Sequence, residues 1–128
     1  MAKVIGSVDD RGRPVIRIDG HQESILVVVD TGFNGDLMVT RAAAQLLGIA
    51  PVSREADVEL GDGTTVRVYQ GRSSISWLGE QRPVRVLVSD SWTTVADAPV
   101  GLLGTELLSP HLLLIDFAAR TVEIETQT

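Results

Sequence analysis

Residues 26–39 read LVVVDTGFNGDLMV and give the strongest indication of the fold. The first part of this stretch belongs to an aliphatic run, Ser24–Val29, which is typical of a strand buried on both faces. Asp30-Thr31-Gly32 follows directly. A carboxylate at the end of a buried strand costs free energy unless it is hydrogen-bonded or used for chemistry. The segment is therefore either a strand followed by an ordinary turn or a strand that presents Asp30 for a reaction.

Short β-branched runs separated by turn residues continue on both sides of this segment, and they predict an all-β fold. Helices are predicted only at residues 40–47, which begin at the N-cap candidate Thr40 and end before Gly48, and at Thr105–Leu108, where Ser109-Pro110 stops the turn. The other strands are expected at residues 4–8, 14–19, 57–60, 65–69, 73–77, 84–88, 112–117 and 121–125.

Composition limits the possible functions of the chain. Its 128 residues predict one domain, residues 1–128, and with 44% hydrophobic but only 4% aromatic residues the core must be aliphatic. The net charge of −6 argues against a nucleic-acid partner, and the absence of cysteine excludes disulfides, thiolate catalysis and cysteine-bound metals. No apolar run is long enough to cross a bilayer and none resembles a signal peptide, so we expect a soluble, cytoplasmic protein without a membrane partner.

Two further motifs accompany Asp30-Thr31-Gly32. Gly61-Asp62-Gly63 lies between two alternating segments and predicts a hairpin turn, and Leu102-Leu103-Gly104 precedes the short helix. In this order the motifs resemble the retropepsin-like aspartic proteases, and most closely the small single-domain cellular members whose motif reads D-T-G-F-x-G. The resemblance covers roughly residues 14–124 and implies a closed β-barrel with one short α-helix and a helical turn, acting as a two-fold dimer.

The resemblance also implies a role for each matching residue. Asp30 would be the catalytic aspartate, Thr31 would hydrogen-bond across the dimer axis, and Gly32 would leave room for substrate. The flap over the substrate would be tipped by Gly61, Asp62 and Gly63. The loop that supports the aspartate from behind would be Leu102, Leu103 and Gly104.

Three positions depart from the retroviral pattern, and two of them, Phe33 and Asn34, are the candidates for contact with substrate in the cleft. Phe33 stands where retroviral members usually have Ala or Ser, which places a bulky group beside the site. Asn34 and Thr105 replace an Asp and an Arg that form an ion pair in those proteins. Because both partners of the pair are absent together, no charge is left without its partner, and different substrate contacts are expected.

The chain contains one Asp-Thr-Gly and no second copy, so one protomer carries half of a two-aspartate site. Peptide hydrolysis by carboxylates needs two of them around one water, which predicts a homodimeric aspartic endopeptidase acting on an extended peptide or protein. No cofactor is implied, and no metal is expected because His21 and His111 are isolated from each other in the sequence. The alternatives are a dimeric peptide-binding or regulatory module of the same fold, inactive because Phe33 fills the cleft, and a structural β domain in which Asp-Thr-Gly is only a turn.

Overall fold

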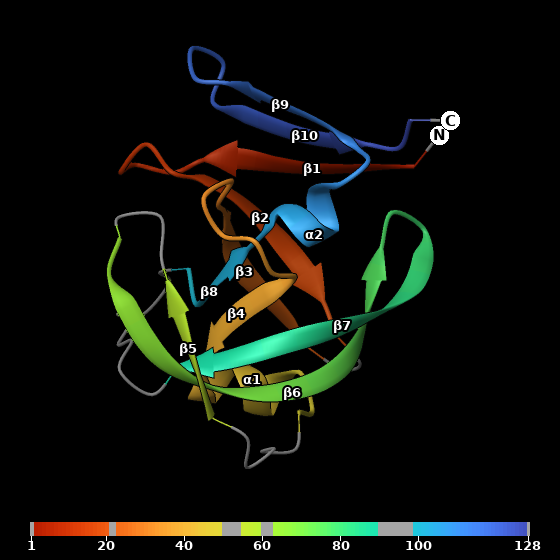
Figure 1. Ribbon diagram of the computed structural model, residues 1–128. Helices are drawn as coiled ribbons and strands as arrows, with labels where there is room; N and C mark the ends of the chain where they lie inside the picture. The colour runs from red at the N-terminus through yellow and green to blue at the C-terminus, as the bar shows by residue number, and fades with distance from the viewer. Residues whose placement is uncertain (1, 21–22, 50–54, 60–62, 90–98, 128) are drawn as a thin grey trace.

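A computed structural model describes residues 2–20, 23–49, 55–59, 63–89 and 99–127. Strands dominate this part of the chain, and only two short helices accompany them (Figure 1). In chain order the elements are β1 (Lys3–Val8), β2 (Pro14–Asp19), β3 (Ser24–Val29), β4 (Leu37–Thr40), α1 (Arg41–Leu46), β5 (Glu55–Glu59), β6 (Thr65–Trp77), β7 (Glu80–Ser89), β8 (Gly101–Leu103), α2 (Thr105–Leu108), β9 (Leu112–Asp116) and β10 (Thr121–Glu125).

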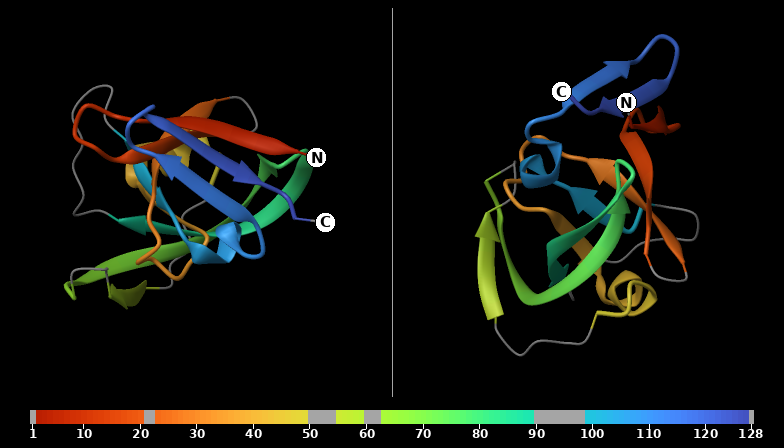
Figure 2. Two further views of the ribbon diagram at one scale, coloured as in Figure 1. Left: turned by 90° about the horizontal axis from the view of Figure 1, so that it is seen from above. Right: turned by 90° about the vertical axis from the view of Figure 1, so that its right-hand side faces the viewer.

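Six of the strands close into a barrel. The strands pair in the order β6-β7-β4-β8-β3-β2, and Asp19 of β2 pairs with Ser76 of β6 to complete the ring. Strand β5 pairs with β6 outside the ring and forms a hairpin with it. Strands β1, β10 and β9 continue the sheet from β2 and lie together at one end of the barrel (Figures 1 and 2).

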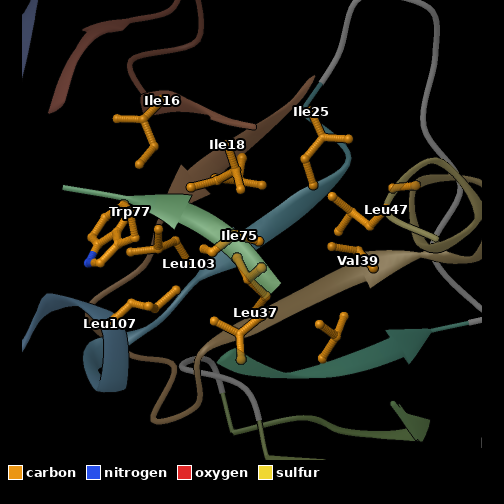
Figure 3. Close-up of a cluster of buried hydrophobic side chains, with 14 of the residues drawn as sticks. Ile16, Ile18, Ile25, Leu37, Val39, Leu47, Ile75, Trp77, Leu103 and Leu107 are labelled. Carbon is orange, nitrogen blue, oxygen red and sulfur yellow. The ribbon is translucent and has the colours of Figure 1, made fainter. Parts of the chain in front are cut away.

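The main core fills the barrel and is mostly aliphatic, as the composition predicts. Figure 3 shows how its side chains converge from opposite walls and from both helical regions. Buried side chains come from strands β2, β3, β4, β6 and β8, from the end of α1 and from α2. They include Ile18, Ile25, Leu37, Leu47, Ile75, Leu103 and Leu107. Fully burying one such side chain contributes about 1.5–3 kcal/mol relative to leaving it exposed.

Both predicted helices are confirmed. The hydroxyl of Thr40 accepts a hydrogen bond from the N–H of Ala43 at 3.1 Å, so Thr40 is the N-cap of α1. Gly48 follows the helix with a φ of 70°, a conformation that favours glycine. Neither of the described helices has the length and apolar character needed to span a membrane.

The strand predictions are confirmed in most places and corrected in three. Residues 65–69 and 73–77 belong to one strand, β6, because Gly71 in the predicted gap pairs with Val86. Two short strands, β4 and β8, were not predicted as strands. In β3, alternate residues are buried and half-buried, so the expected burial on both faces is wrong. The predicted strand end at Leu60 lies outside the described residues.

Candidate active site

Asp30 lies at the carboxyl end of β3, beside a second strand that runs in the same direction. Strand β3 pairs in parallel with β8, and the last pair of the ladder joins Val29 to Leu103. The backbone N–H of Asp30 then donates a hydrogen bond to the carbonyl oxygen of Leu103 at 2.9 Å. The backbone of Asp30 is thus fixed by the sheet, while its side chain is half-buried at the carboxyl end of β3.

The turn after β3 holds the carboxylate in place. The N–H of Gly32 donates to Oδ1 of Asp30 at 2.9 Å, and the N–H of Phe33 donates to the Asp30 carbonyl oxygen at 3.2 Å. Within the described part of the chain, Oδ2 of Asp30 has no hydrogen-bond partner. Thr31 and Gly32 are exposed on the surface. One carboxylate oxygen is therefore engaged by the turn and the other is available to a ligand, a water or a second chain.

The predicted supporting loop lies directly behind this turn. Leu103 is fully buried, Leu102 is half-buried, and the N–H of Gly104 donates to the carbonyl oxygen of Asp36 at 2.9 Å. A side chain at Gly104 would collide with the carbonyl oxygens of Phe33 and Gly35. Glycine is thus required at this position by the close approach of two backbone segments.

Phe33 points into the protein, which corrects its expected place in the cleft. Its side chain is only 2% exposed and belongs to a small apolar cluster, separate from the main core, with Met38, Val68 and Leu87. Leu102 packs against the same cluster. The ring therefore links the Asp30 turn to β4, β6, β7 and β8, and it presents almost no surface to a substrate.

Asn34 differs from Phe33 because its side chain is exposed. It lines a pocket of about 440 Å³ between the turn, α2 and the two longest strands. Asn34 was predicted from the sequence, but the other polar residues of the pocket were not; these are Asp36, Arg72, Arg85 and Glu106. Sequence spacing carries no signal for this set, because strand pairing and chain closure bring it together.

Of the predicted flap tip, only Gly63 is described; Gly61 and Asp62 lie outside the described residues. Gly63 has a φ of 86° and is exposed, with no other group near enough to contact an added side chain. The strands on either side pair in antiparallel fashion up to Glu59 and Thr65. The predicted hairpin is therefore present, and its action as a flap stays a prediction.

In the described ranges, no group of three or more His, Cys, Asp or Glu residues is arranged so that it could hold a metal ion. His111, one of the two histidines, packs edge-on against Trp77 with ring centroids 6.4 Å apart. Desolvation by burial, with a smaller contribution from the charge of Arg82, holds the pKa of His111 below its ordinary value. This residue therefore belongs to the packing around α2.

Comparison with known proteins finds a similar solved structure, but no matching family model and no matching curated protein. Among solved structures, the chain is similar to the crystal structure of a retropepsin-like aspartic protease from Rickettsia conorii, with a TM-score of 0.63 and 20% sequence identity. The match covers 95% of this chain and 89% of the other. The closed barrel, the Asp30 turn at its sheet edge and this likeness together show that the chain has the retropepsin-like fold.

Proposed function

We propose that the chain is one protomer of a homodimeric aspartic endopeptidase. The observation that carries the proposal is the state of Asp30, whose Oδ1 is held by the N–H of Gly32 at 2.9 Å while Oδ2 stays without a partner among the described residues. An ordinary Asx turn explains the first contact. It does not explain why this turn is fixed to β8 and α2 from behind while its outer face, Thr31 and Gly32, is left exposed.

In the proposed dimer, a two-fold axis passes beside the two Asp30 turns, and their carboxylates share one proton around a water molecule. The ionised carboxylate takes a proton from the water, whose oxygen attacks the peptide carbonyl carbon. The protonated carboxyl polarises the carbonyl oxygen. Collapse of the tetrahedral intermediate breaks the C–N bond, and the leaving nitrogen receives a proton from the pair. The hairpin of β5 and β6 would close over an extended peptide and exclude water.

The alternative of a peptide-binding module with an inactive aspartate pair rested on Phe33 filling the cleft. Since the Phe33 ring is 2% exposed and packed inside the protein, that physical reason for inactivity is removed. The module stays an alternative that only turnover can separate from the enzyme. Location in the cytoplasm stays a prediction from the sequence.

The proposed function is tested by digestion of a peptide library, with the fragments identified by mass spectrometry. The wild-type chain should cleave at mildly acidic pH, and Asp30→Asn should abolish cleavage without loss of folded structure. Asp19→Asn is the matched control, because Asp19 is an exposed aspartate at the end of β2 and lies outside the turn. Cleavage that survives in Asp30→Asn would refute the proposal.

A further inference from the structure

The pocket next to Asn34 is a candidate binding site beside the Asp30 turn. Its volume is about 440 Å³, and three parts of the chain form its walls: the turn before β4, the first residues of α2, and the middle of β6 and β7. In Figure 1 the turn and α2 lie on the same side of β7. The lining residues outside the turn are Arg72, Pro83, Val84, Arg85 and Glu106.

Two of these residues form an unusual pair. Arg72 and Arg85 lie directly opposite each other in the antiparallel ladder of β6 and β7, and both are exposed. Like charges at such positions repel each other and destabilise the sheet. Among the described residues, neither guanidinium group has a carboxylate partner. A bound anion between them would remove the repulsion, and the planar fork of arginine matches a carboxylate in two hydrogen bonds.

The acidic residues of the pocket indicate which class of anionic ligand it can bind. Oδ2 of Asp36 accepts a hydrogen bond from the backbone N–H of Arg85 at 3.0 Å, and the side chain of Glu106 is exposed. The pocket thus holds two positive and two negative side chains beside the amide of Asn34. A free inorganic anion would pair with the arginines but would offer no hydrogen-bond donor to the carboxylates or to the Asn34 amide oxygen. A peptide offers both complements, a carboxylate for the arginines and amide N–H groups for the acidic and amide oxygens.

The pocket is also joined rigidly to the aspartate turn. The carbonyl oxygen of Phe33 accepts the N–H of Thr105 at 2.8 Å, and that of Gly35 accepts the N–H of Glu106 at 3.2 Å. Asn34, between these two anchored residues, lines the pocket and lies four positions after Asp30. A peptide held across Asp30 has a fixed neighbouring surface on which it can continue.

We propose that this pocket binds a carboxylate of the peptide substrate, away from the scissile bond, between Arg72 and Arg85. The proposal rests on the proposed function, since it takes the bound peptide to be the substrate, but the binding step does not require cleavage. The carboxylate can come from an Asp or Glu side chain or from the C-terminus of the peptide. Both sources present the same group to the two guanidinium forks.

Binding is measured on the Asp30→Asn chain, so that peptide is held and not cut. The probes are fluorescently labelled, N-acetylated and C-amidated peptides of extended Val- and Thr-rich sequence that contain one Glu, together with their Gln counterparts. A third peptide has Gln inside and a free C-terminal carboxylate. We expect a carboxylate-bearing peptide to bind roughly tenfold more tightly than the neutral one, the effect of one charge-assisted contact. The Glu peptide and the free-terminus peptide assign the source.

Arg72→Gln and Arg85→Gln should each remove this preference, so that each variant binds the carboxylate peptide and the neutral peptide with similar affinity. Thermal unfolding should show no loss of stability in either variant, because each relieves the repulsion in the pair. Arg17→Gln is the matched control, since Arg17 is an exposed arginine on β2 outside the pocket, and it should keep the preference. Equal affinity for neutral and carboxylate peptides, or a preference that survives in both pocket variants, overturns the proposal.

The two proposals fail separately. If the wild-type chain cleaves peptides and shows no carboxylate preference in binding, the pocket inference is wrong and the endopeptidase stands. If the chain never cleaves but Asp30→Asn keeps a preference that depends on Arg72 and Arg85, the pocket is a peptide-binding site of a non-catalytic module.

Discussion

A Cβ atom at Gly104 would lie 2.6 Å from the carbonyl oxygen of Phe33. This close approach is where the turn that carries Asp30 rests on the segment before α2. Directly beyond it, the N–H of Thr105 donates to the same carbonyl oxygen at 2.8 Å. The position of the aspartate therefore depends on a contact between two backbones, which no side-chain rearrangement can relieve.

Gly104→Ala should destabilise the fold by about 3 kcal/mol, because the added methyl group forces two backbone segments apart. Gly63→Ala is the comparison. Its φ of 86° is unfavourable for alanine, but an added Cβ meets nothing within 4 Å, so its cost should stay near 1 kcal/mol. Urea denaturation of both variants measures the difference. Equal losses would show that the turn can move away from Gly104 freely.

Phe33→Ala should cost about 3–5 kcal/mol of stability, since it removes a ring that is 2% exposed from a small apolar cluster. Peptide cleavage should fall as well, because the ring supports the turn that holds Asp30. Phe117→Ala serves as control, because that ring is 62% exposed and its loss should change the free energy of unfolding little. A Phe33→Ala chain of unchanged stability and faster cleavage would place the ring in the cleft after all.

Mixing the wild-type chain with Asp30→Asn should reveal whether the active unit is a pair. At a fixed total concentration with equal amounts of each chain, only about a quarter of randomly formed dimers carry two intact aspartates. Activity should therefore fall to about one quarter of that of the pure wild-type chain at the same total. A fall to only one half, as expected for protomers that act independently, would contradict the two-fold arrangement.

The fold should lose stability as the pH falls through the range in which His111 titrates. Desolvation by burial and the nearby charge of Arg82 lower the pKa of His111 in the folded state relative to its ordinary value of 6.5. The unfolded chain then binds a proton at a higher pH than the folded chain does, so this contribution is complete above about pH 6.5 and declines below it. His111→Phe keeps an aromatic contact with Trp77 and removes the titrating group.

Thermal unfolding at neutral pH and at pH 5 measures this effect. The wild-type chain should lose more stability between the two conditions than His111→Phe does. Carboxylates such as Asp9, whose pKa is lowered by the backbone N–H groups of Arg13 and Arg11, lose their contribution only at lower pH and affect both chains alike. Parallel curves for wild type and variant would exclude a role for His111.

Local signals in the sequence were sufficient for the elements that stabilise themselves through near neighbours. Thr40 before an Ala-rich segment predicted the start of α1, and the hairpin of β5 and β6 was predicted from turn residues between two alternating runs. Strands β4 and β8 are four and three residues long, and they are strands because they pair with each other and with β7 and β3. Pairing at that distance in the sequence leaves no local pattern.

In the candidate site, too, some features could be predicted from local sequence, whereas others depend on contacts between distant parts of the chain. Asp30 and Gly104 could be found from motifs. The close approach of two backbone segments requires glycine at position 104, and the Asp30 side chain accepts the N–H of Gly32, a turn contact typical of Asp and Asn. The direction of the Phe33 side chain could not, since it depends on the space left by Gly35 and Gly104 and on Val68 from a strand far along the chain. Arg72 and Arg85 meet only through the register of β6 and β7, which the predicted break in β6 concealed.

Strand β1 pairs with β10 from Lys3–Glu125 to Ser7–Thr121, so the earliest described strand finds one of its two neighbours near the other end of the chain. During synthesis, β1 leaves the ribosome before the other described strands, and this edge stays uncovered until β10 has followed. Contacts so distant in sequence slow folding, and an uncovered strand edge invites pairing with other chains. A nascent or truncated chain that lacks β10 would thus carry an open β1 edge, and its fate would be decided by competition between completing synthesis and aggregating.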